Sequence, residues 1–233
     1  RVQSEVLGGY FFRQSLWSCI ALSGFGIAVF VDLRVYRKFV WIIGLTGVTL
    51  LGLVLVPGVG ENVNGATRWL DLGPMNLQVS DPARLTLLIV LAAYFGSHQR
   101  HLDHVYKGFV QPGILAGILV VLILLQPDFG TAFLFAAVTG CLFFLAGVRI
   151  KYLLPAALAG LVLFAIAIAR DPVRLERIMS FLDVEANRGN GTYQLWQGLI
   201  GFGVGGVNGV GLGNGRQPFA FLPEAHTDFI FPV

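Results

Sequence analysis

Residues 129–148 read FGTAFLFAAVTGCLFFLAGV and contain no charged side chain. A stretch of this length and composition is what an α-helix needs to cross the hydrocarbon core of a bilayer. The rest of the chain has the same character: 55% of its 233 residues are apolar, only 12% are charged, and the mean hydropathy is +0.74. So few charges cannot cover the surface of a water-soluble globule of this size. The sequence therefore predicts an integral membrane protein.

Further apolar runs flank this segment on both sides. They cover residues 16–31, 39–56, 85–96, 113–125 and 152–169, and another begins at Phe229. Two of them, 85–96 and 113–125, are short for a perpendicular span, so they either draw on flanking residues or form broken helices shielded by protein. We predict an all-α polytopic membrane protein with about six complete spans in a single membrane domain, residues 1–233. Because the chain starts at Arg1 without a signal peptide and stops just after an apolar run begins, we expect this domain to be incomplete at both ends.

The basic residues predict how these spans are oriented. Seven Lys and Arg side chains, against two acidic ones, lie in three short loops at residues 32–38, 97–108 and 149–151. Cytoplasmic loops carry such an excess, so we assign all three to the cytoplasmic side. A first outer loop (57–84) and a large outer loop (170–227) then face outward. Residues 193–210 of the large loop are mostly apolar, which predicts a helix that lies in the outer interface or re-enters the membrane.

The most informative polar stretch reads LPEAHTDFIF at residues 222–231. Pro223 suits the first turn of a helix and Glu224 suits its positive end, so we expect a helix to start here and enter the membrane. Glu224 and Asp228 are four residues apart and share one face of this helix, with His226 to the side. An ionisable residue at the membrane end of a helix is a functional hypothesis by default, whereas capping and interfacial anchoring explain the pattern equally well.

Other polar groups are expected on the same outer side. NGATRW at residues 64–69, with Arg84, places two guanidinium groups and an indole there, and Arg suits bidentate binding of phosphate. Membrane anchoring is the stronger alternative for this loop, because Trp and Arg are common interfacial anchors. In QPDFGT at residues 126–131, Asp128 is predicted to cap the following helix rather than to act in catalysis. A glycine-rich turn leads into Arg216 and would tolerate an anion.

Three histidines recur in the second basic loop. His98, His101 and His104 lie at three-residue spacing without a cysteine partner. A solvated face is favoured over a metal site for this pattern.

Three of these segments together resemble the SEDS family of shape, elongation, division and sporulation proteins. The matching residues are NGATRW with the stretch 72–85, QPDFGTA at 126–132, and GLGN at 211–214 with LPEAHTDFIF. The resemblance runs through the chain in order, and LPEAHTDFIF is its most specific part. Ala225 and GLGN are more similar to members that act in division than to members that act in elongation.

The resemblance implies an identity for the enzyme and roles for its residues. Members are multi-pass helical bundles of the bacterial cytoplasmic (inner) membrane with a large extracytoplasmic loop. They polymerise lipid II into glycan strands beside a class B penicillin-binding protein and other division or elongation proteins. By motif, the family's essential acid maps onto Asp228, its loop arginine onto Arg68, and a basic residue onto Arg84. The sequence departs from the family at four positions, Val79, Asp81, Arg84 and Pro232, where Pro, Glu, Lys and Ala are usual. The charges are kept, but the geometry of the first outer loop is in question.

The implied reaction needs a base for the attacking hydroxyl and cations for the departing pyrophosphate. We assign Asp228 as the base, Arg68, Arg84 and Arg216 to the pyrophosphate, and Glu224 with His226 to orienting the base or holding a divalent cation. The family's donor bond is α and the new bond β, so a single inverting displacement suffices. A lipid II flippase is the alternative, but the charges are expected at the outer surface rather than along a midplane path. A scaffold without chemistry would leave the outer acids dispensable, and no nucleic-acid partner is expected.

Overall fold

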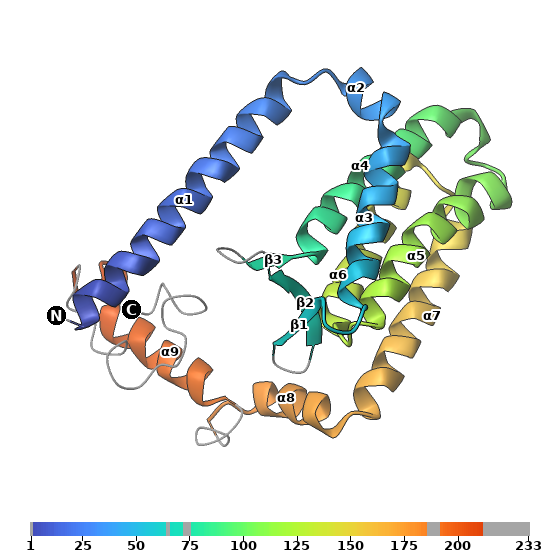
Figure 1. Cartoon of the computed structure of the whole chain (residues 1–233). Helices are drawn as coiled ribbons and strands as arrows, with labels where there is room; N and C mark the ends of the chain where they lie inside the picture. Colours follow the sequence, from blue (N-terminus) through green and yellow to red (C-terminus); the bar gives the residue numbers. More distant parts are fainter. Residues whose placement is uncertain (1, 64–65, 72–75, 186–191, 212–233) are drawn as a thin grey trace. The chain divides into compact units, whose positions relative to one another are not determined.

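The structure is a computed structural model that describes all residues except 1, 64–65, 72–75, 186–191 and 212–233. The described residues are mainly helical (Figure 1). The α-helices are α1 (Val2–Phe30), α2 (Leu33–Lys38), α3 (Val40–Val54), α4 (Ser80–His98), α5 (Gln111–Leu124), α6 (Phe129–Ala146), α7 (Ile150–Ala169), α8 (Pro172–Leu182) and α9 (Tyr193–Gly205). A 3-10 turn, η1 (Gln99–His101), and a π-helical segment, η2 (Val105–Val110), connect α4 to α5.

Each of the six complete apolar runs forms a helix. In the part of the chain that the structure describes, three helical segments are long and apolar enough to cross a membrane: Val105–Leu124, Phe129–Ala146 and Ile150–Ala169. The first of them joins η2 to α5, so the short run 113–125 does draw on flanking residues. The apolar stretches Gln14–Phe30 and Val40–Val54 are shorter, and α4 contains the run 85–96. The predicted pattern of helices is confirmed for these segments.

A small sheet between α3 and α4 corrects the all-α prediction. Strands β1 (Gly60–Val63), β2 (Ala66–Asp71) and β3 (Asn76–Gln78) form an antiparallel sheet in the order β1-β2-β3. Trp69 pairs with Glu61 on one side and with Gln78 on the other. Ala66 and Leu70 of β2 are buried, and β1 and β2 contact α3. These short strands could not be predicted from the sequence, because their apolar and polar residues do not alternate regularly.

The core lies among α3, α4, α5 and α6. Fully buried side chains from all four helices meet there, including Leu51, Leu87, Leu91, Ile123 and Phe135. Helices α3 and α4 approach closely at Gly47, where a Cβ atom would lie 2.7 Å from the Thr86 side chain. Small residues permit such close helix packing in membrane proteins.

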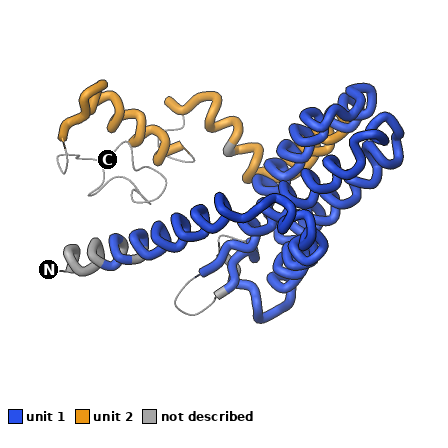
Figure 2. The backbone as a smooth tube through the Cα atoms, turned by 90° about the horizontal axis from the view of Figure 1, so that it is seen from above, with its two compact units in different colours: residues 1–157 blue, residues 158–233 orange. Residues whose placement is uncertain are grey.

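The chain divides into two compact units, residues 1–157 and 158–233, with the boundary inside α7 (Figure 2). The second unit contains α8 and α9. Helix α9 confirms that a helix forms within residues 193–210, and its placement in the interface stays a prediction. Helix α8 lies in the charged part of the large loop, before α9. Asp171 caps it, because its Oδ1 accepts hydrogen bonds from the amides of Val173 and Arg174.

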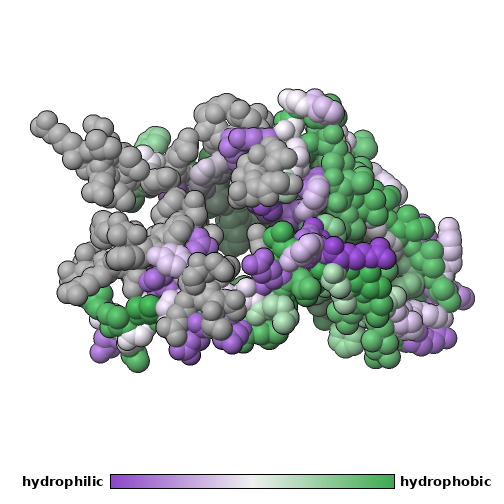
Figure 3. Space-filling model, turned by 90° about the horizontal axis from the view of Figure 1, so that it is seen from below, coloured by the Kyte–Doolittle hydropathy of each residue, from purple (hydrophilic) through white to green (hydrophobic). Residues whose placement is uncertain are grey.

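Many large apolar side chains of the spanning helices point outward. Trp41, Leu45, Phe144, Leu145 and Leu163 are each more than half exposed. Figure 3 shows wide hydrophobic areas over one face of the molecule, interrupted by hydrophilic side chains. A surface of this kind suits lipid or further protein rather than water.

Candidate functional site

Two of the six predicted site residues fall in the described part of the chain. Arg68 lies on β2 and Arg84 lies in the first turns of α4. The other four, Arg216, Glu224, His226 and Asp228, lie outside the described residues, and their roles stay predictions. In the described part of the chain, the candidate site consists of Arg68, Arg84 and the groups around them.

Arg68 forms an ion pair with a residue that is distant in sequence. Its Nη1 donates to Oδ2 of Asp128 over 3.0 Å, across 60 positions of the chain. The Asp128 side chain is only 8% exposed and the Arg68 side chain 29%. A partly buried, charge-assisted hydrogen bond of this length fixes a guanidinium group far better than an exposed pair does.

Asp128 is itself held by the start of α6. Its Oδ1 accepts from the amide of Thr131 over 3.1 Å, and its Oδ2 accepts from the Thr131 hydroxyl over 2.9 Å. The predicted cap of this helix is therefore confirmed. Helix N-termini favour a negative charge, so the ionised form of Asp128 is stabilised at this position.

The protonation state of Asp128 follows from these contacts. Burial acts to raise its pKa, but the hydrogen bonds from Thr131 and Arg68 outweigh burial and hold the pKa below its usual value. Asp128 is consequently a carboxylate at neutral pH. With both oxygens engaged, it is suited to orienting Arg68 rather than to accepting a proton from a substrate.

Buried polar atoms near the same helix ends lack partners. Gln126 is 1% exposed; its Nε2 donates to the Leu51 carbonyl over 3.1 Å, while its Oε1 has no hydrogen-bond partner among the described residues. The same holds for the Ser80 hydroxyl and for Nε of both Arg68 and Arg84. Buried polar atoms are normally paired, so unpaired donors indicate a place for water or a ligand.

Arg84 is less constrained than Arg68. Its Nη2 lies 3.6 Å from Oδ1 of Asp81, one turn away on α4, and both side chains are well exposed. Such pairs contribute little to stability and rearrange easily. Arg84 is thus free to turn toward an anion, whereas Arg68 is fixed.

Sequence reasoning identified both arginines but missed the link from Arg68 to Asp128. The only local signal was Thr131, three residues after Asp128, which is typical of a helix cap. Nothing in the sequence indicated that β2 and the turn before α6 meet.

The opposite end of the helices gathers the three basic loops. Nε of Arg149 donates to Oδ1 of Asp103 over 2.8 Å, which joins the second loop to the third. Arg37 of the first loop lines the same groove as His98 at the end of α4. These loops therefore lie on one side of the helices, as the charge pattern requires.

The three histidines of the second loop do not share a common set of contacts. Nδ1 of His98 lies 3.0 Å from the Tyr94 carbonyl, and the rings of His101 and His104 are 6.3 Å apart at their centroids. Among the residues that the structure describes, no group of three His, Cys, Asp or Glu side chains is arranged to hold a metal ion.

The FtsW, RodA and SpoVE family model, described as "Cell cycle protein", matches residues 2–233. The chain belongs to this family. The resemblance to the SEDS proteins is thereby confirmed over residues 2–233.

Individual FtsW relatives support the assignment. The probable peptidoglycan glycosyltransferases FtsW of Saccharophagus degradans and Coxiella burnetii are 39% and 41% identical to this chain over 221 and 227 residues. These matches cover 95% and 96% of this chain but only 57% and 60% of the relatives. FtsW of Nitrosococcus halophilus is 43% identical, with 58% of its length covered. The chain thus spans less than two thirds of the relatives that it matches.

Solved structures share the fold. A structure described as "Structural coordination of polymerization and crosslinking by a peptidoglycan synthase complex" superposes with a TM-score of 0.70 at 27% identity, over 95% of this chain and 60% of that one. The rod shape determining protein RodA of Thermus thermophilus gives a TM-score of 0.57 at 30% identity, over 67% of this chain and 50% of RodA. The Arg68–Asp128 pair therefore belongs to an FtsW/RodA-type fold.

Proposed function

We propose that the full-length protein is a peptidoglycan glycosyltransferase that polymerises lipid II into glycan strands. Membership of the FtsW/RodA family and the relatives named as probable peptidoglycan glycosyltransferases support this proposal. Because those relatives are FtsW proteins, the proposed role is in division rather than elongation. The products would form at the outer face of a bacterial cytoplasmic membrane.

The observation that carries the proposal is the state of Arg68. Its Nη1 is engaged by Asp128, while its buried Nε has no partner among the described residues. The remaining donors are presented by a group whose position is already fixed, which lowers the entropy lost when an anion binds. Lipid II carries a pyrophosphate, and a guanidinium fork matches phosphate oxygens in a bidentate manner.

The proposed reaction uses residues of both outer loops. Asp228 takes the proton from the attacking hydroxyl as general base, with Glu224 and His226 orienting it or holding a divalent cation. Arg68, Arg84 and Arg216 stabilise the charge that develops on the departing pyrophosphate. A single displacement with inversion converts the α-linked donor into the β-linked product.

The proposed orientation places this chemistry outside the cell. The three basic loops lie on one side of the helices, and the positive-inside rule assigns that side to the cytoplasm. The outer loops 57–84 and 170–227, and with them every proposed site residue, then face outward.

We also propose a class B penicillin-binding protein as the partner that crosslinks the strands. Support comes from the similarity to the structure described as a peptidoglycan synthase complex. The wide apolar areas on the spanning helices offer surface for a partner's membrane helix.

The test is strand formation from lipid II by the purified full-length protein with its partner. Asp228→Asn keeps the side-chain volume but removes nearly all basicity, so polymerisation should fall by roughly a hundredfold or more. The Glu224→Gln protein should lose less polymerisation, because Glu224 is assigned a supporting role four residues before Asp228 in the sequence. Co-purification of the partner controls for folding.

Two results would redirect the assignment. Near-normal polymerisation by the Asp228→Asn protein would remove Asp228 from its role as base. Loss of lipid II transport with polymerisation intact would instead favour a flippase.

A further inference from the structure

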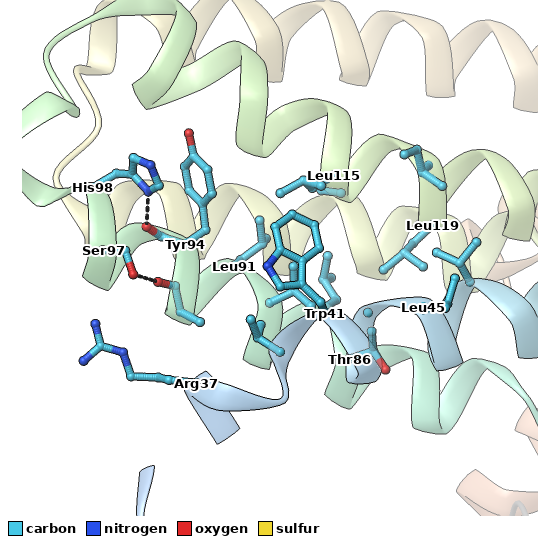
Figure 4. Close-up of a pocket in the computed structure, with 18 residues that line it drawn as sticks. Arg37, Trp41, Leu45, Thr86, Leu91, Tyr94, Ser97, His98, Leu115 and Leu119 are labelled. Carbon is cyan, nitrogen blue, oxygen red and sulfur yellow. Dashed lines mark hydrogen bonds between the residues drawn. The ribbon is translucent and has the colours of Figure 1, made fainter. Parts of the chain in front are cut away.

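A long apolar groove runs along α3, α4 and α5 at the end that carries the basic loops. Its volume is about 480 Å³. The buried side chains of Leu87, Leu91 and Leu119 line its floor, and the exposed side chains of Trp41 on α3 and Ile118 on α5 line its walls. Figure 4 shows Leu91, Leu119 and Trp41 among the lining residues. None of the proposed glycosyltransferase site residues lines this groove.

The charged and most of the polar groups of the groove gather at one end, and Thr86 is the polar side chain nearer the other end (Figure 4). Arg37, Ser97 and His98 lie at the polar end, and Leu45 and Leu119 lie at the other (Figure 4). The Ser97 hydroxyl donates to the Ala93 carbonyl over 2.9 Å, and the His98 ring stacks on Tyr94 with 4.4 Å between centroids. These two side chains are therefore held in place around the groove's polar end.

Arg37 is the charged group at this end. The neighbouring Arg34 lies 3.8 Å from Oδ2 of Asp32, whereas Arg37 has no acidic partner among the described residues. A cation without a counter-charge, next to an apolar channel, is complementary to an amphiphile with an anionic head and a hydrocarbon tail.

We propose that this groove binds an anionic phospholipid from the leaflet at the α2 end, with an acyl chain along the leucine floor and the phosphate on Arg37. Trp41 is 80% exposed at the wall. Trp is favoured at this depth of a membrane because its ring is apolar and its N–H is polar.

A further helix of the longer protein is the competing occupant. A helix laid over this groove would have to provide an acid for Arg37 or bury a charge without compensation, which is strongly unfavourable. A lipid phosphate meets that requirement at the membrane surface without burial of the charge. The charge of Arg37 therefore favours the lipid.

The test uses the full-length protein in nanodiscs of equal parts phosphatidylglycerol and phosphatidylcholine, with retained lipid counted by native mass spectrometry. Arg37→Gln should lower the retained ratio of phosphatidylglycerol to phosphatidylcholine by about fivefold, the scale of one basic group near an anionic surface. Arg34→Gln is the matched control, because Arg34 lies outside the groove, and it should leave the ratio unchanged.

A second pair of variants tests the acyl channel. Ala93 lines the groove and the exposed Ala92 does not. Ala93→Trp should fill the channel and remove most retained lipid of both kinds, while Ala92→Trp should not. If Ala93→Trp does not fold, the two arginine variants decide the question alone.

Equal ratios for Arg37→Gln and Arg34→Gln would overturn the proposal. Failure of the unchanged protein to retain phosphatidylglycerol would also overturn it, and would assign the groove to a helix of the longer protein.

Discussion

Nη1 of Arg68 on β2 lies 3.0 Å from Oδ2 of Asp128, the residue that caps α6. One carboxylate thus performs two functions: it caps the N-terminus of a spanning helix, and it fixes a guanidinium group beside that helix. A mobile arginine loses about 2 kcal/mol of rotamer entropy when it binds a ligand. Because Asp128 already fixes Arg68, part of this cost is met before an anion binds. Asp128 therefore contributes both to the stability of α6 and to the position of Arg68 in the proposed site.

The first prediction separates the orienting role of Asp128 from its capping role. Asp128→Asn keeps an oxygen for the Thr131 amide but loses the charge that holds Arg68. We expect the affinity for lipid II to fall on the order of tenfold, as when an orienting partner is removed elsewhere. Thr131→Val, which removes only the hydroxyl contact, is the control and should change affinity much less. The measurement is lipid II binding to the purified full-length protein.

A double-mutant cycle then shows whether the two residues act through each other. Arg68→Ala and Asp128→Asn should together cost less affinity than the sum of their separate costs. Arg84→Ala with Asp81→Asn is the comparison, because that exposed pair should be close to additive. Full additivity for Arg68 and Asp128 would mean that the ion pair does not position Arg68.

The second prediction concerns acid sensitivity. The pKa of Asp128 is below its usual value because the bonds from Thr131 and Arg68 outweigh the opposing effect of burial. A carboxyl group with a lowered folded-state pKa stabilises the fold fully above its unfolded pKa of about 3.9, and this contribution is lost as the pH falls through the folded value. We expect the thermal unfolding midpoint in detergent to decline below about pH 4, with a shallower decline for Asp128→Asn.

Asp103 provides the matched control for this measurement. Its pKa is also lowered, first of all by the hydrogen bond from Arg149, but both side chains are exposed. Salt should therefore screen the Asp103 contribution and leave that of Asp128 nearly unchanged. If high salt removes the Asp128 component as well, the Arg68–Asp128 pair is not shielded as the structure indicates.

The sequence predicted most of the helical architecture but not the site's geometry. The run 129–148 and its neighbours identified the helices because a bilayer imposes length and apolarity on each span locally. The sheet was missed because β3 has only three residues and its pairing with Trp69 is not local. The Arg68–Asp128 pair was missed for the same reason: it depends on β2 meeting the turn before α6, 60 positions along the chain.

The third prediction tests the close contact between α3 and α4. A Cβ atom on Gly47 would lie 2.7 Å from Cγ2 and Oγ1 of Thr86, so Gly47→Ala forces the helices apart. We expect a loss of about 1–3 kcal/mol in the free energy of unfolding, the usual cost of overpacking. Gly52→Ala on the same helix is the control, because nothing lies within 4 Å of its Cβ position. Adding Thr86→Ala should recover part of the loss, and equal unfolding of the two glycine variants would contradict the close contact.

The last prediction tests the orientation on which the proposed site depends. Arg100 lies in the basic loop that is assigned to the cytoplasm, and Asn190 lies in the large loop that is assigned to the outside. Cys19 and Cys141 are free and exposed, so both are first replaced by serine. A single cysteine at position 190 should then react with a membrane-impermeant maleimide in intact cells, while one at position 100 should react only after the membrane is opened.

A cysteine at position 38, in the first basic loop, should behave like position 100, because Arg37 next to it lines the same groove as His98. Reaction of positions 100 and 190 from the same side would remove the outward placement of Arg68 and Arg84, and with it the proposal that they bind the pyrophosphate of lipid II outside the cell.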